Sequence, residues 1–138
     1  MKPLKFLLVF ILTYSCSNHP EMYSKYLNGY WEIENVTFTN GQVKAYNYND
    51  TVDYIEVNDS LIGFRKKLKP NFKGSFETSD DKELLRVVFE NDSLNLYYET
   101  PFSKWKETVL EASETHLKVI NANKVVYLYK KYEPLDLY

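Results

Sequence analysis

The sequence is poor in the residue types that build reactive centres. It has one cysteine, two histidines and four glycines among 138 residues. One cysteine cannot form a disulfide within the chain, and no cysteine and histidine cluster has the spacing of metal ligands. So few glycines leave no phosphate-binding loop, and no serine lies in the Gly-x-Ser-x-Gly pattern of a hydrolase. The sequence therefore favours a protein that is not an enzyme, and it predicts no cofactor and no metal.

A basic excess and long apolar runs are missing as well. The net charge is −2, and it becomes −4 without residues 1–15 because Lys2 and Lys5 lie there. Nucleic-acid binding needs a basic surface, so a nucleic-acid partner is not expected. The longest apolar run, residues 6–12, is far shorter than the about 20 residues that a membrane-spanning helix requires.

What is present begins with an N-terminal targeting pattern. Two lysines precede the apolar run, and Ser15 follows it directly before Cys16. A positive start with an apolar core of roughly 7–15 residues is typical of a secretory signal peptide. We therefore predict that residues 1–15 form a signal peptide that is removed. An ordinary cleaved signal next to a stray cysteine is the alternative interpretation.

Thr13-Tyr14-Ser15-Cys16 resembles the lipobox of bacterial lipoproteins, in which a small residue precedes a cysteine that becomes lipidated. The resemblance implies that Cys16 carries the lipid and holds the protein in the cell envelope, at the outer membrane, on either face. Lipidation would also remove an unpaired thiol, which is a liability in an oxidising compartment. Residues 16–20 then form a short tether, residues 21–132 one domain, and residues 133–138 a frayed tail.

The domain has the rhythm of a β protein. Tyrosine is abundant at 13 residues, phenylalanine follows with 8, and alanine is scarce, which favours strands over helices. A short helix is expected over residues 20–27. After it come nine or ten short strands, joined by turns such as Asn40-Gly41 and Asn91-Asp92, with a bulge near Asn35. Residues 84–89 are nearly all apolar, so we expect that strand to be buried on both sides or to lie at a sheet overlap.

Short connections make neighbouring strands antiparallel, so the strands are expected to form an up-and-down meander. A long meander leaves two unpaired edges, and closure into a barrel removes them. The sequence therefore predicts an all-β fold, an antiparallel barrel of eight to ten strands with a short N-terminal helix. A two-sheet β-sandwich is the alternative.

Gly29-Tyr30-Trp31 opens the first strand directly after the expected helix. This resembles the G-x-W motif of lipocalins, and the chain is similar in length and rhythm to small lipocalin-like lipoproteins of Gram-negative bacteria. The resemblance implies that Gly29 permits the turn into the strand and that Trp31 plugs the closed end of the barrel. Lipocalins usually place an arginine over this tryptophan, and this chain has Lys130 and Lys131 in that region.

Aromatic residues of the later strands are the candidate ligand site. Tyr98, Trp105, Tyr127 and Tyr129 can point into a barrel, where they could line a cavity for a small apolar or amphipathic molecule. Eight-stranded barrels occur in both forms, and a core filled or nearly filled by these side chains is the interpretation that we favour over an open cavity.

The charged residues offer one further candidate surface. Arg65, Lys67 and Lys69 share one face of a strand, which is either a solvated outer face or a basic strip that contacts acidic lipid headgroups or a partner. Five acidic residues could act as acid and base or bind Ca²⁺, although turns explain most of them: Asp50, Asp53, Glu77, Asp80 and Asp81. The sequence thus predicts a lipid-anchored, non-catalytic protein that binds a small hydrophobic ligand. The alternative is an adaptor on an envelope protein complex.

Overall fold

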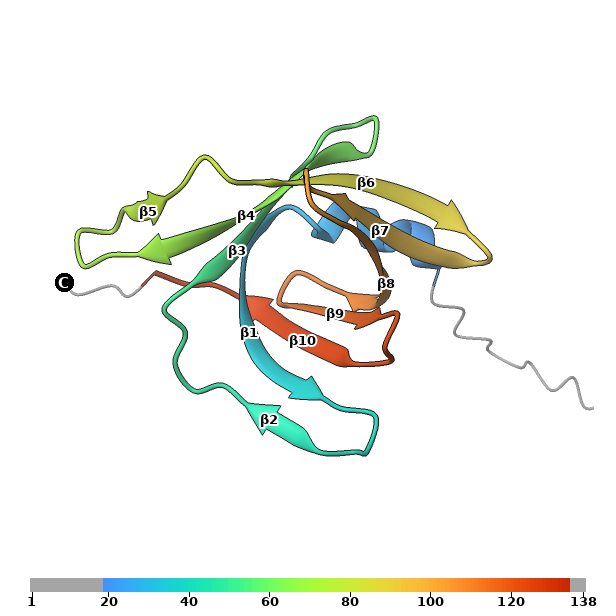
Figure 1. Ribbon diagram of the computed structural model, residues 1–138, viewed down its shortest axis with the longest axis horizontal. Helices are drawn as coiled ribbons and strands as arrows, with labels where there is room; N and C mark the ends of the chain where they lie inside the picture. The colour runs from blue at the N-terminus through green and yellow to red at the C-terminus, as the bar shows by residue number, and fades with distance from the viewer. Residues whose placement is uncertain (1–18, 135–138) are drawn as a thin grey trace, which may run out of the picture.

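The computed structural model of the chain describes residues 19–134, which form one β-barrel with a short helix at one end (Figure 1). The predicted signal peptide and Cys16 lie outside the described residues. No helix within the described part of the chain is long and apolar enough to cross a membrane.

The chain enters the fold through a single 3-10 helix, η1 (Pro20–Tyr26), which has Pro20 near its start, where a missing N–H costs nothing. Ten strands follow: β1 (Gly29–Thr37), β2 (Val43–Ala45), β3 (Val52–Val57), β4 (Ile62–Pro70), β5 (Phe76–Thr78), β6 (Glu83–Glu90), β7 (Ser93–Glu99), β8 (Lys104–Ala112), β9 (His116–Asn121) and β10 (Val126–Lys131).

Eight of these strands close into a barrel. Their order is β10-β9-β8-β7-β6-β4-β3-β1, every pairing is antiparallel, and β1 also pairs with β10 from Trp31↔Lys131 to Thr37↔Val126. That last pairing joins the first and last strands of the meander, as Figure 1 shows, where β1 and β10 lie side by side. The predicted antiparallel barrel is therefore confirmed, and the two-sheet sandwich is excluded.

Two short strands lie outside the ring. β2 extends the edge of β1 from Asn35 to Thr37, and β5 pairs with the last residues of β4. The register of β1 against β10 shifts between Ile33 and Asn35, so the predicted bulge is present. Asn91 and Asp92 join β6 to β7 with φ angles of 50° and 60°, which are typical of the tight type I′ turn that matches strand twist.

The core fills the barrel and is sealed at one end by η1. Leu27 and Trp31 are completely buried, and Tyr23 and Tyr26 of the helix pack against the same cluster of leucines and valines from β6–β9. The prediction that residues 84–89 are buried on both sides is wrong. Leu85 and Val87 point into the core, whereas Leu84 lies on the outer surface and is 54% exposed.

Candidate functional site

The closed end of the barrel is built around Trp31. Its indole Nε1 donates to the carbonyl of Leu27 at 2.9 Å, which ties the end of η1 to β1. The ammonium group of Lys131 lies 4.1 Å from the centre of the Trp31 ring and donates to the carbonyl of Asn28 at 2.9 Å. Lys131 thus occupies the position over the tryptophan where lipocalins usually have an arginine. Burial lowers its pKa below the ordinary lysine value.

Gly29 makes this arrangement possible. Its φ of +133° is a conformation that side chains disfavour, and a Cβ atom there would lie 2.6 Å from the Lys131 Nζ atom. Glycine therefore lets the chain turn from η1 into β1 while the lysine crosses directly above.

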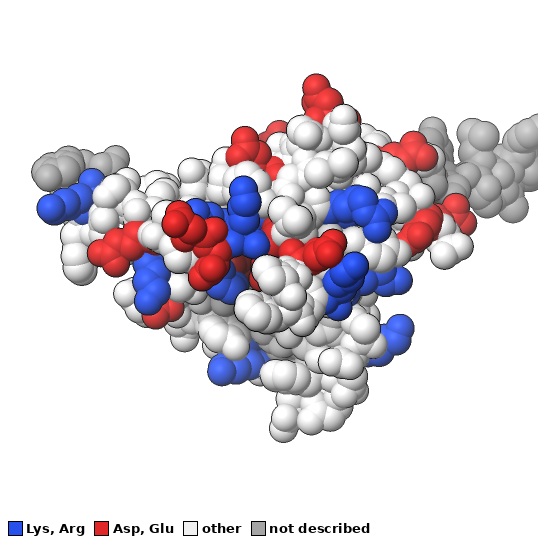
Figure 2. All heavy atoms as spheres, turned by 45° about the horizontal axis from the view of Figure 1, so that its top comes forward, with Lys and Arg blue, Asp and Glu red and all other residues white. Residues whose placement is uncertain are grey.

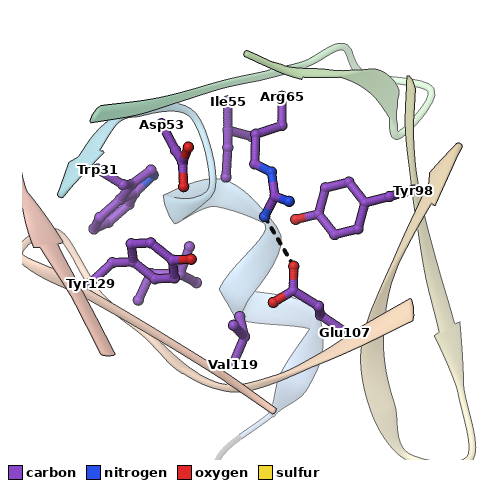
Figure 3. A pocket seen from close by; sticks show the side chains of 9 residues that line it. Trp31, Asp53, Ile55, Arg65, Tyr98, Glu107, Val119 and Tyr129 are labelled. Atoms are coloured by element: carbon purple, nitrogen blue, oxygen red, sulfur yellow. Dashed lines mark hydrogen bonds and ion pairs between the residues drawn. The ribbon is translucent and has the colours of Figure 1, made fainter. Parts of the chain in front are cut away.

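A cluster of charged groups occupies the barrel interior next to Trp31 (Figure 3). The Arg65 guanidinium forms ion pairs with Glu83 and with Glu107, the latter at 3.0 Å, and it lies 4.1 Å from the centre of the Tyr98 ring. The side chain of Arg65 is only 12% exposed and that of Glu107 only 7%. Charges this deeply buried need partners, because they have lost their hydration.

Three further polar groups complete the cluster. Asp53 is buried and accepts from the Lys67 ammonium at 2.7 Å, and Figure 3 shows the hydroxyls of Tyr98 and Tyr129 directed toward the middle of the barrel. Burial raises the pKa of both tyrosines, so both keep their protons at neutral pH. Burial is also the main reason why the pKa of Glu107 is raised, although Arg65 opposes that rise.

The space between these groups is very small. The cavity bounded by Trp31, Asp53, Arg65, Tyr98 and Tyr129, among others, has a volume of about 10 Å³. That is room for about one water molecule. The interior of the barrel is therefore filled by side chains and does not hold a ligand of ordinary size in this conformation.

The four aromatic residues of the candidate ligand site therefore do not surround one common cavity. Tyr98 and Tyr129 line the small interior cavity, and Trp105 stacks on Tyr98 with ring centres 5.4 Å apart. Tyr127 packs against the core and does not line this cavity. The structure does not bring the four together around one space.

A larger space lies on the outside of the barrel, across β4, β6, β7 and β8. This outer groove has a volume of about 460 Å³. Leu85, Tyr98 and Trp105 also line it, although their side chains lie on the inward face of β6, β7 and β8. Its walls are outward side chains of β4, β6, β7 and β8: Ile62, Leu84, Arg86, Tyr97, Glu99, Lys104 and Lys106.

The walls combine apolar and basic chemistry. Ile62 and Leu84 are 55% and 54% exposed, so both present apolar surface to the groove. Arg86, Lys104 and Lys106 supply three cations against the single carboxylate of Glu99. Figure 2 brings the top of Figure 1, and with it β6, toward the viewer, and shows basic and acidic side chains interspersed with uncharged surface on that face.

The candidate basic strip is not an exposed strip in the structure. Its face of β4 is turned toward the barrel interior, so Arg65 is buried among carboxylates and Lys67 is paired with Asp53. Both sequence-based interpretations of Arg65, a solvated outer face and a lipid-contacting surface, are therefore wrong. Lys67 and Lys69 remain exposed at the end of the strand.

The acidic candidates are dispersed. Asp53 belongs to the interior cluster, whereas Asp50, Glu77, Asp80 and Asp81 are exposed in loops or on the short strand β5. Within residues 19–134 no group of three or more histidine, cysteine or acidic side chains could hold a metal ion. Glu83 and Glu107 were not singled out from the sequence, because only the strand register shows that they meet Arg65.

Comparison with known proteins supports the fold. No family model and no curated protein matches the sequence. A lipocalin-like protein from Bacteroides uniformis ATCC 8492 matches in structure with a TM-score of 0.50 and 10% identity, over 77% of this chain and 98% of that one. An uncharacterized protein from Bacteroides eggerthii DSM 20697 matches with a TM-score of 0.50 and 13% identity, over 77% and 99%. The domain thus has a lipocalin-like fold.

Proposed function

We propose that this protein is a lipid-anchored, non-catalytic protein of the cell envelope that binds a small amphipathic molecule in the outer groove of its barrel. The contrast between the two spaces carries the proposal: about 460 Å³ outside against about 10 Å³ inside. Sites for small molecules usually measure about 300–1,000 Å³ and combine apolar walls with a few polar groups. The outer groove fits that description.

The interior cluster supports the non-catalytic part of the proposal. Arg65 is held between Glu83 and Glu107, and Asp53 is held by Lys67. A catalytic acid or base must reach the proton that it transfers, and a cavity of about 10 Å³ has no room for a substrate beside these groups. These charged side chains neutralise one another, and we assign them a structural role.

Leu84 provides the test of the groove as the binding site. Replacing Leu84 with serine should weaken binding of the neutral fluorescent amphiphile N-phenyl-1-naphthylamine about tenfold, because burying a leucine side chain contributes roughly 1.5 kcal/mol or more. Fluorescence titration of the chain from residue 16 onward, with Cys16→Ser, measures the dissociation constant. That chain keeps all of residues 19–134, which form the barrel and its helix.

Leu110→Ser is the matched control for this variant. Leu110 is also an outward leucine of the barrel, 42% exposed, but it does not line the groove. Its replacement should leave the dissociation constant within about twofold. Equal binding by both variants and the unaltered chain would place the probe elsewhere and refute the groove as the site.

The anchor rests on Cys16, and it is tested by Cys16→Ser in the full-length chain. We expect the unaltered protein to fractionate with membranes and the variant to appear in the aqueous fraction, because the lipid supplies the attachment. From Cys16 to η1, which begins at Pro20, the chain can span only about 3.3–3.6 Å per residue, so the barrel would sit close to the bilayer. Membrane association that is equally tight in the variant argues against the anchor.

An adaptor role is the second candidate, and the filled interior favours it. Aromatic side chains also cover the outer face near β1, β3 and β5: Tyr30 stacks on Tyr54 at 4.7 Å and on Phe76 at 5.1 Å. Such a surface suits contact with another protein. Native mass spectrometry of protein purified from its host separates the two roles, since a retained small molecule indicates a binder and a co-purifying subunit an adaptor.

A further inference from the structure

We propose that the outer groove selects amphipathic molecules with an anionic group, and that Arg86 and Lys106 hold this group above Tyr97. The inference rests on the proposed function, because it names the class of ligand for the same groove. The apolar part of the ligand would lie against Leu84 and Ile62. The occupant is one free small molecule, and the recognised group is a carboxylate, sulfonate or phosphate.

Strand register places the two cations on either side of one aromatic ring. Arg86 of β6 pairs with Tyr97 of β7, and Tyr97 pairs in turn with Lys106 of β8. Residues directly opposite on neighbouring antiparallel strands share a face and lie about 4.5–5.5 Å apart. The three side chains therefore form a row across the groove, and the Arg86 guanidinium already lies 4.9 Å from the Tyr97 ring centre.

The charges of this row are not neutralised by neighbouring carboxylates. Within the described residues, neither Arg86 nor Lys106 has a carboxylate oxygen within 4.0 Å. Glu99 pairs with Lys104 at 3.3 Å in the next row. Glu90, the acidic residue on the same outward face of β6, accepts from the Tyr97 hydroxyl and from Asn95. The ring of Tyr97 is thus flanked by two cations that have no carboxylate partner, which is an arrangement that an anion completes.

The apolar part of the site adjoins this row. Ile62 of β4 pairs with Arg86 across the strands, and Leu84 is the next outward residue along β6. The anion-binding row and the apolar wall are therefore contiguous within one space of about 460 Å³. A single small molecule fills such a volume. Binding to an acidic bilayer surface usually requires a cluster of four to eight basic residues, and the ion pair of Lys104 with Glu99 interrupts the basic character here.

Two fluorescent probes of similar size separate charge recognition from apolar contact. 1-Anilinonaphthalene-8-sulfonate carries a sulfonate, whereas N-phenyl-1-naphthylamine is neutral. In the chain from residue 16 with Cys16→Ser, the double variant Arg86→Gln/Lys106→Gln should weaken binding of the sulfonate at least tenfold. Binding of the neutral probe should change less than twofold, because the apolar wall is intact.

A control with the same net charge excludes a general electrostatic effect. Lys44→Gln/Lys118→Gln also removes two positive charges, from β2 and β9, which lie outside the groove. This variant should bind both probes within twofold of the unaltered chain. Equal loss of sulfonate binding in both double variants would overturn the inference, because long-range charge would then be the cause. Circular dichroism verifies that each variant keeps its strands.

The remaining outcomes separate the inference from the proposed function. If Leu84→Ser weakens the neutral probe while Arg86→Gln/Lys106→Gln leaves the sulfonate unaffected, the groove binds ligands but does not select anions. If Leu84→Ser affects neither probe, the proposed function itself fails. Sedimentation with phosphatidylglycerol vesicles is the third arm. Vesicle binding that depends on Arg86 and Lys106, with probe binding unchanged, would make a bilayer the occupant and overturn the proposal of a free small molecule.

Discussion

Replacing Arg65 with methionine should lower the free energy of unfolding by about 3–5 kcal/mol at pH 7. Methionine fills most of the volume, but the variant leaves Glu107, 7% exposed, and its neighbour Glu83 without their common cation. An uncompensated buried carboxylate cannot recover its hydration inside a filled barrel. Urea denaturation followed by far-ultraviolet circular dichroism measures the change. Lys104→Met, which breaks an exposed ion pair with Glu99, is the control and should cost at most about 1 kcal/mol.

The decrease in the free energy of unfolding caused by Arg65→Met should depend on pH. Burial already raises the pKa of Glu107, so the folded state holds that proton more tightly than the unfolded chain does. Ionised Glu107 therefore reduces stability as the pH rises above the ordinary carboxyl range. Removing Arg65 deletes the attraction that opposes the rise, so the variant should be less impaired near pH 4.5 than at pH 7.

Glu107→Gln provides the second check on this cluster. Added to Arg65→Met, it removes the buried charge and should restore roughly 1–2 kcal/mol at pH 7 while abolishing most of the pH dependence. A loss below about 1 kcal/mol for Arg65→Met, equal at both pH values and unaffected by Glu107→Gln, would mean that the carboxylates are hydrated and that the interior is not closed.

Replacing Trp31 with alanine should lower the free energy of unfolding by about 3–5 kcal/mol, the range found when a large buried aromatic side chain is truncated. The residue is completely buried, and it also supplies the N–H that bonds Leu27 and the ring beneath Lys131. The change would thus open the closed end and separate η1 from the barrel. Urea denaturation gives the magnitude, and amide hydrogen exchange of residues 20–27 reports the helix directly.

Trp105→Ala is the matched control for Trp31→Ala. Trp105 stacks on Tyr98 but is only partly buried, so its loss should cost clearly less and leave exchange in η1 unchanged. If the two tryptophan variants were equally destabilised, Trp31 would have no special role in closing the barrel.

Strand order and closure could be predicted from the sequence because they depend on local signals. Alternation in residues 93–99 and the turns at Asn40-Gly41 and Asn91-Asp92 define neighbouring antiparallel strands without knowledge of distant contacts. Closure then follows from the unpaired edges of a long meander. These expectations match β7, the two hairpins and the pairing of β1 with β10.

Which face of each strand points into the barrel was harder to predict from the sequence. Period-two alternation shows that Arg65 and Lys67 share a face, and that Phe64 and Leu68 share the other, but it does not say which face is inside. The apolar pair suggests that the charges point outward. In the structure the charges point inward, because Glu83, Glu107 and Asp53 from three other strands neutralise them there, while Phe64 contacts Tyr54 on the outside.

The outer groove depends on long-range register and could not be seen in the sequence. Its row of Arg86, Tyr97 and Lys106 comes from three strands, and a shift of one residue in either pairing would turn part of it inward. The same limit explains why Tyr98 and Tyr129 could be placed in the barrel but the small volume between them could not. Volume depends on every rotamer in the interior.

Methyl nuclear magnetic resonance during a titration with 1-anilinonaphthalene-8-sulfonate locates the ligand most directly. We expect saturable shifts of the methyl signals of Ile62 and Leu84, which line the outer groove, while those of Ile55 and Leu117, which line the interior cavity, stay in place. Shifts confined to Ile55 and Leu117 would show that the barrel opens to take its ligand inside, and would contradict the outer groove as the binding site.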